Sequence, residues 1–243
     1  MTEPYGEAFF ADQAEGSLRS ARVIAPLVVD LVHPTSIVDV GCGIGTWLSA
    51  FRESGVRQVH GFDGAYVDRT KLLIPAESFT AVDLRTPEAL TGTYDLALCL
   101  EVAEHLPTAV SGRLVAALTR LAPVVLFSAA IPGQTGTDHI NEQWPSFWEA
   151  HFRTLGYRAI DAVRPTVRED RRVDWWYRQN VMLFASEDAI AARPGLTALA
   201  REHPAADLEW VHVEVVRKYE HTRHLARELV DRVRRKFLGP DRT

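Results

Sequence analysis

The chain has 243 residues, of which 47% are hydrophobic and 24% are charged, as is typical of one soluble α/β domain with added segments. The net charge of -5 argues against general nucleic-acid binding, and no apolar run approaches the roughly 20 residues of a membrane span. The first ten residues are unlike a signal peptide, and Cys42 and Cys99 form no C-x-x-C pair, so we expect reduced thiols in a cytoplasmic protein.

Short apolar runs alternate with helical patterns from residue 36 to residue 156. We predict strands at 36–40, 57–63, 78–84, 94–101 and 123–130, and helices at 46–54, 108–121 and 146–156. This alternation predicts a mostly parallel sheet with helices on both faces. The runs at 157–165 and 179–186 are typical of two strands joined without a helix, which predicts an antiparallel pair at one edge.

The chain divides into three segments of one structural domain. Residues 1–35 are expected to form an N-terminal helical segment, either a lid over a ligand with Tyr5, Phe9, Phe10, Ser17 and Ser20 as contact residues or a plain packing helix. Residues 36–186 are expected to form the core, and 187–243 a C-terminal helical extension. Within the extension, residues 206–237 are expected to be one long helix whose apolar face carries Leu208, Val211, Val215, Leu225 and Leu229. That face could pack on its own domain or on a second subunit, so a homodimer remains open.

The ends of the predicted strands carry the most informative residues, because ligands of such sheets bind beyond the carboxyl ends of the strands. The first strand leads into Asp39-Val-Gly41-Cys-Gly43, whose glycines allow a tight turn and a close ligand. The G-x-G-x-G spacing differs from the dinucleotide fingerprint G-x-G-x-x-G. Asp39 would repel a pyrophosphate and attract a cationic ligand. An ordinary turn between strand and helix is the alternative.

Two further aspartates follow the second and third strands. Asp63 stands twenty residues after the glycines and could accept both ribose hydroxyls of a nucleoside, or it could cap a helix. Asp83 could accept from an adenine amino group while Leu84 offers its amide, or Asp83 could serve only the turn.

The ordered motifs VDVGCGIGTWL, GFDG, AVDL and YDLALCLEVAEHLP resemble those of the class I S-adenosylmethionine-dependent methyltransferases. The resemblance covers about residues 36–185. It implies S-adenosylmethionine as cofactor and a Rossmann-like, seven-stranded sheet of order 3-2-1-4-5-7-6 with the last strand antiparallel. It also implies a set of cofactor-binding residues: Asp39, Gly41, Gly43, Asp63, Gly64, Asp83, Leu84, Leu100 and Glu101.

Residues for the chemical step are expected near the ends of the fourth and fifth strands. His139 is the expected general base, Glu142 could orient its ring, and His105 is the next candidate. Two carboxylates and two imidazoles could also hold a divalent metal ion through Glu101, Glu104, His105 and His139. This pattern is similar to E-x-x-E-H with a distant histidine in small-RNA 2'-O-methyltransferases, and to ubiquinone-pathway O-methyltransferases. The alternative is that the glutamates and His105 only organise the turn.

An aromatic and basic segment between the last two strands is the expected acceptor site. Trp175, Trp176 and Tyr177 could form a stacking wall together with Trp144, and Arg178 with neighbouring arginines could bind an anionic group. The alternative is that the aromatic side chains belong to the core and the arginines are solvated. The segment is similar to bacterial methyltransferases of glycan and secondary-metabolite pathways.

Together these features predict an enzyme that methylates a hydroxyl of a small molecule, such as a sugar, a nucleotide-linked sugar or a secondary metabolite. Three alternatives remain. A metal-assisted RNA 2'-O-methyltransferase is disfavoured by the acidic net charge, and an NAD-dependent oxidoreductase is disfavoured by the glycine spacing. A non-catalytic cofactor-binding partner protein is disfavoured by the polar residues at 101–105 and 138–142.

Overall fold

The computed structural model describes residues 7–206 and 208–217, and the side chains from residue 16 onward. The expected lid residue Tyr5, the side chains of Phe9 and Phe10, and the helix residues Leu225 and Leu229 lie outside this part of the chain. Residues 1–209 belong to one compact unit, and the described residues after it, 210–217, belong to a second.

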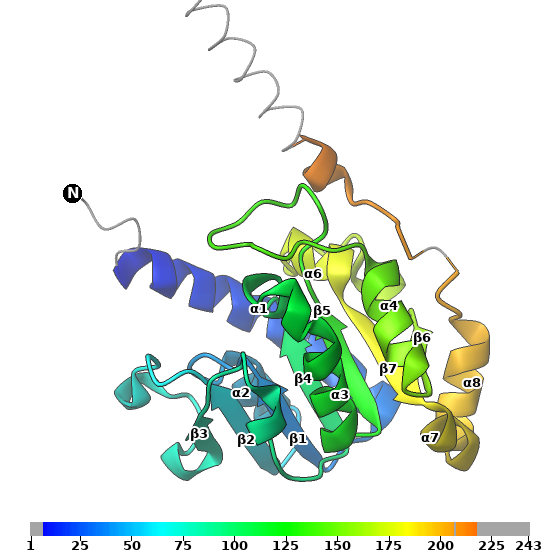
Figure 1. The fold of residues 1–243 in the computed structure, drawn as a ribbon, viewed down its shortest axis with the longest axis horizontal. Coiled ribbons are helices and arrows are strands. Elements are labelled where there is room, and N and C mark those ends of the chain that lie inside the picture. The colour runs from blue at the N-terminus through cyan, green and yellow to red at the C-terminus, as the bar shows by residue number, and fades with distance from the viewer. Residues whose placement is uncertain (1–6, 207, 218–243) are drawn as a thin grey trace, which may run out of the picture. The chain divides into compact units, whose positions relative to one another are not determined.

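A seven-stranded sheet forms the centre of the first unit (Figure 1). Its order is β3-β2-β1-β4-β5-β7-β6, as predicted. Strand β7 runs opposite to the other six strands, also as predicted, so its pairs with β5 and β6 are antiparallel and all other pairs are parallel. The strands are β1 (Ser36–Val40), β2 (Gln58–Asp63), β3 (Phe79–Ala81), β4 (Leu96–Leu100), β5 (Val124–Ser128), β6 (Tyr157–Ile160) and β7 (Met182–Ser186).

Helices cover both faces of the sheet, and a separate hydrophobic core fills each side. One core joins α1 (Glu7–Val32) and α2 (Thr46–Glu53) with α7 (Glu187–Ala192) and α8 (Pro194–Glu202); the other joins α3 (Ser111–Leu121) and α4 (Pro145–Thr154). Successive strand residues alternate between the cores, so Leu96 and Leu98 face the first and Ala97 and Cys99 the second. Burial on both faces explains why β4 and β5 read as almost continuous apolar runs.

The connection from β6 to β7 differs from the prediction of a direct join. It contains two short helices, α5 (Arg164–Val167) and α6 (Trp175–Asn180). The start of α6 is fixed by α1, since the Asp174 amide donates to the Ser20 hydroxyl at 2.9 Å and Arg19 donates to the Asp174 carboxylate at 2.8 Å. These partners lie more than 150 residues earlier in the chain, so local sequence does not reveal them.

The predicted helix at 206–237 is also wrong at its start. Within the described residues, 208–209 form a turn and helix begins only at Val213. The chain is held extended before this point, because Pro204 bridges to Ile160 and the Asp161 amide donates to the His203 carbonyl at 3.0 Å.

The remaining described elements are short. They are the 3-10 helices η1 (Arg69–Lys71), η2 (Ala76–Ser78), η3 (Pro87–Ala89), η4 (Ala103–His105) and η5 (Thr108–Val110). None of the described helices is both long enough and apolar enough to cross a bilayer.

Candidate active site

The glycine loop after β1 combines close packing with open space. Gly41 has a φ of 89°, and a Cβ atom there would lie 2.3 Å from the Val102 side chain, so glycine lets this loop pack against the chain leaving β4. Gly43 has a φ of 54°, and a Cβ atom there would meet no described atom within 4 Å. The loop therefore offers its backbone to an open region at Gly43.

Asp63, at the end of β2, is tied to this loop. Its side chain is only 4% exposed, and its two carboxylate oxygens accept from the amides of Gly43 and Gly64, each at 2.6 Å. The hydroxyl of Tyr66 donates to the same oxygen as the Gly64 amide. The predicted ribose acceptor thus lies beside the glycine loop, held by backbone donors.

Asp39 in β1 is buried close to Asp63. Burial, and then the charge of Asp63, raises the pKa of Asp39 well above its ordinary value. A bound cation would lower this pKa again, because it would favour the charged carboxylate.

Three other predicted cofactor contacts follow β3 and end β4. Asp83 is exposed, and its carboxylate is engaged by the guanidinium of Arg85 at 2.8–3.1 Å and by the Arg85 amide at 3.0 Å. This arrangement favours the turn role of Asp83 over adenine binding. Leu84 is half-buried and Leu100 is buried, and both belong to the hydrophobic cores.

The chain after β5 is anchored to the chain after β4, which brings His139 beside His105. The amides of Ile140 and Asn141 donate to the Glu104 carbonyl at 2.9 and 3.0 Å, and the Asn141 side chain donates to the Ala103 carbonyl at 3.2 Å. As a result the two imidazole rings lie 5.0 Å apart, edge to face. Asn141 is a single polar residue without a local pattern, so this anchoring role could not be predicted.

Glu142 orients the His139 ring. Its carboxylate accepts from the amides of Gly133 and Thr135 at 2.8 and 2.7 Å and lies 3.0 Å from His139 Nδ1. The segment that carries both residues is a loop. A proton on Nδ1 would bind Glu142 and leave Nε2 as the free acceptor.

Glu104, in the chain after β4, is a fully buried carboxylic acid. It is 0% exposed, and neither carboxylate oxygen forms a hydrogen bond of ordinary geometry with the described residues. Burial, and then the charge of Glu101, raises the pKa of Glu104 well above its ordinary value. Burial, and then the charge of His139, lowers the pKa of His105. These groups therefore favour neutral forms in the absence of a ligand.

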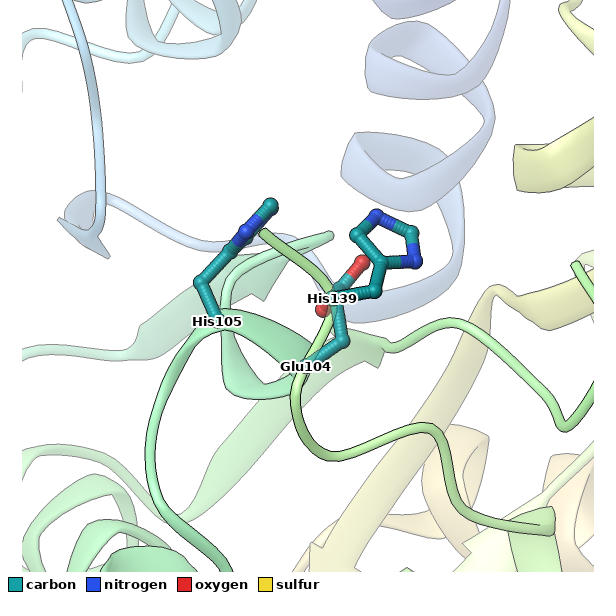
Figure 2. Close-up of side chains that lie close together, drawn as sticks. All are labelled: Glu104, His105 and His139. Atoms are coloured by element: carbon teal, nitrogen blue, oxygen red, sulfur yellow. The ribbon is translucent and has the colours of Figure 1, made fainter. Parts of the chain in front are cut away.

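Three of the four predicted metal ligands converge. Figure 2 shows Glu104, His105 and His139, which each offer a ligand atom within 4.8 Å of the other two. The fourth, Glu101, points its carboxylate to other partners, the side-chain amides of Gln134 at 2.9 Å and Asn180 at 3.1 Å. Glu101 has a φ of 54°, which is uncommon for a residue other than glycine. Gln134 and Asn180 are buried polar residues that sequence analysis did not identify.

The predicted acceptor-binding residues are distributed around α6 and the start of α4. Tyr177 is buried; it shares a hydrogen bond of 3.1 Å with Ser17 and accepts one of 3.4 Å from Trp47 Nε1. Trp175 and Trp176 are half-buried, and Trp144, at the start of α4, is 38% exposed. The stacking role therefore stays a prediction for the tryptophans, while the Tyr177 ring belongs to the core.

Three arginines of this region have partners within the protein. Arg164 pairs with Asp161 and Arg172 with Asp170, at 2.8 and 2.6 Å, and Arg178 donates to the Arg168 carbonyl at 3.1 Å. The structure thus gives the prediction of an anionic acceptor no independent support.

Comparisons with known proteins identify a family and a shared fold. A family model described as "Methyltransferase domain" matches residues 11–185. No curated protein matches the chain. Similar solved structures include CalS10 from Micromonospora echinaspora, an amino pentose methyltransferase with bound SAM, at 18% identity, covering 76% of this chain and 99% of that one with a TM-score of 0.54.

Magnesium protoporphyrin IX methyltransferase from Synechocystis PCC 6803, with bound SAH, is also similar, at 18% identity, 75% and 90% coverage and a TM-score of 0.53. The methyltransferase domain of a bacterial Hen1 protein has 16% identity, 69% and 97% coverage and a TM-score of 0.51. At these identities the structures establish the shared fold.

Proposed function

The chain belongs to the methyltransferase-domain family, and from this premise we propose that it transfers a methyl group from S-adenosylmethionine to a hydroxyl of a small molecule. The observation that carries this proposal is that the open Gly43 backbone, the buried Asp63 carboxylate and the His139–Glu142 pair all lie at, or in the chain that follows, the carboxyl ends of parallel strands of one sheet. Sites of ligands in open α/β sheets lie at this edge, where the strand order reverses.

The residues around the glycine loop fit S-adenosylmethionine. Asp63 can accept ribose hydroxyls, and a sulfonium cation would draw the buried Asp39 toward its charged form, which its raised pKa otherwise disfavours. The bound cofactor supplies an activated methyl group, so the protein has chiefly to align the acceptor with it.

His139 is the proposed general base. With Nδ1 held by Glu142, its Nε2 can take the proton of an acceptor hydroxyl as the methyl group is transferred.

Sugars, nucleotide-linked sugars and hydroxylated secondary metabolites are the proposed acceptors, and the similarity to the amino pentose methyltransferase CalS10 supports this class. The free, buried thiols of Cys42 and Cys99 support the expected cytoplasmic location.

Calorimetry with purified protein tests the cofactor. We expect S-adenosylmethionine and S-adenosylhomocysteine to bind and NAD not to bind, because the G-x-G-x-G spacing of the loop differs from the dinucleotide fingerprint. Tight NAD binding without a response to S-adenosylhomocysteine would reject the proposal in favour of an oxidoreductase.

Metal-assisted transfer is a second candidate, and the state of Glu104 favours it. A buried carboxylate that forms no hydrogen bond of ordinary geometry with the described residues, beside two imidazoles, has the donor atoms of a divalent transition-metal site. In that case the metal ion would lower the pKa of the acceptor hydroxyl, and His139 would be a ligand and not a base.

Removal of metal by EDTA and the variant His105→Ala distinguish the two candidate mechanisms. Metal-assisted transfer predicts that exhaustive EDTA treatment abolishes turnover, that added Mn²⁺ restores it, and that His105→Ala removes metal binding measured by calorimetry. His151→Ala, a histidine on α4 outside the trio, is the matched control. Full turnover after EDTA treatment, with a mild effect of His105→Ala, would reject the metal and support His139 as the base.

A further inference from the structure

Tyr66 holds the carboxylate that the cofactor is proposed to use. Its side chain is 83% exposed, yet its hydroxyl donates to Oδ1 of the buried Asp63. The ring also lies directly over Gly64, where a Cβ atom would come within 2.1 Å of the ring atom Cε1. Glycine at position 64 therefore makes this placement of Tyr66 possible.

The capacity of the Asp63 carboxylate is limited. Its two oxygens together offer about four lone-pair sites. The Gly64 amide and the Tyr66 hydroxyl donate to Oδ1, and the Gly43 amide donates to Oδ2, so three donors are already in place. A ribose diol brings two more donors, so one of the three must leave.

Only one of these donors can leave without rebuilding the backbone. The amides of Gly43 and Gly64 belong to the turns after β1 and β2, and the Gly64 carbonyl is itself bound by the Val67 amide at 3.2 Å. The Tyr66 hydroxyl, in contrast, is at the end of an exposed side chain that can rotate into solvent.

We propose that a ribose hydroxyl of the cofactor replaces the Tyr66 hydroxyl on Asp63, so that Tyr66 sets cofactor affinity by competition. This inference rests on the proposed cofactor site. Binding is then an exchange of hydrogen bonds. The apparent dissociation constant equals the intrinsic one divided by the fraction of protein in which Tyr66 has left Asp63, so the closed state of Tyr66 weakens binding. Tyr66 thereby favours ligands whose hydroxyls can take its place over nucleotides that lack them.

Calorimetry with S-adenosylhomocysteine tests the exchange. Tyr66→Phe keeps the ring and removes the competing donor, so we expect binding about 3- to 10-fold tighter than in the wild type. Tyr94→Phe, at a half-buried tyrosine before β4, is the matched control and should change nothing. In an Asp63→Ala background, Tyr66→Phe should give no gain, since the contested carboxylate is absent.

A measurement on the ligand-free protein tests the contact itself. Burial at the hydroxyl end, and then the hydrogen bond to Asp63, raises the pKa of Tyr66. Alkaline ultraviolet titration, as the difference between wild type and Tyr66→Phe, should show this tyrosine titrating late, and Asp63→Ala should move it back toward the ordinary value near 10.

The outcomes are separable. Unchanged or weaker S-adenosylhomocysteine binding in Tyr66→Phe would overturn the exchange while leaving the proposed function intact. A Tyr66 that titrates normally in the wild type would overturn the contact. Wild-type protein that shows the raised pKa but binds no S-adenosylhomocysteine would overturn the proposed function and the exchange with it.

Discussion

Replacing His139 by alanine is expected to lower turnover by about 10²- to 10⁴-fold, the usual contribution of a positioned proton acceptor. The dissociation constant of S-adenosylhomocysteine should hardly change, because Asp63 and the glycine loop lie at the ends of β2 and β1, whereas His139 lies in the chain after β5. The measurement is release of S-adenosylhomocysteine with an acceptor found in a screen of nucleotide sugars and phenols.

Companion variants separate proton transfer from simple loss of structure. His139→Asn should fail as fully as alanine, since an amide cannot take the proton. Gly136→Ala should also lower turnover, because a Cβ atom there would lie 2.2 Å from His139 Nε2 and displace the ring. Near-normal turnover of His139→Ala across about pH 6 to 9 would place the base elsewhere, with His105 as the next candidate.

Replacing Asp63 by alanine is expected to weaken S-adenosylhomocysteine binding by about 10- to 150-fold, which corresponds to about 1.5–3 kcal/mol for hydrogen bonds to a charged acceptor. The loss includes the ribose contacts and the support that Asp63 gives to the amides of Gly43 and Gly64. Calorimetry on the variant gives the affinity directly.

A second aspartate provides the control for this variant. Asp68 is exposed and caps the next turn through the Thr70 amide at 3.0 Å, so Asp68→Ala removes a carboxylate nearby without touching Asp63. Asp68→Ala should bind S-adenosylhomocysteine nearly as tightly as the wild type, so the affinities of the two variants should differ by nearly the whole loss expected for Asp63→Ala. Equal affinities would mean that the ribose is bound elsewhere. Thermal unfolding of both variants shows whether the loss reflects binding or stability.

Sequence patterns predicted the parts of this protein that depend on local chemistry. The apolar runs gave the strands and, with the resemblance to methyltransferases, their order in the sheet. The glycine loop and Asp63 were found because the conformation of the turn and the position at a strand end restrict the residue types that fit. His139 and Glu142 were paired by their spacing, and the structure brings them within hydrogen-bond distance.

The parts that sequence did not predict depend on distant partners. Asn141 anchors the loop of His139 to Ala103, and Gln134 and Asn180 hold Glu101, yet each is a single polar residue without a local pattern. The helix α6 was expected to be a loop because its segment is polar, and contacts with α1 stabilise its start. Tyr66 was missed because an exposed tyrosine after a strand gives no indication that its hydroxyl reaches a buried carboxylate.

The junction of α1 with α6 has a consequence for the order in which the chain folds during synthesis. Ser17 shares a hydrogen bond with Tyr177, 160 residues later, and Ser20 accepts from Asp174, 154 residues later. Because the ribosome delivers the N-terminal end first, β1, β2 and β4 can pair with one another while this side of α1 still lacks its partners. The helix made first is therefore completed among the last, after Asp174 and Tyr177 have emerged.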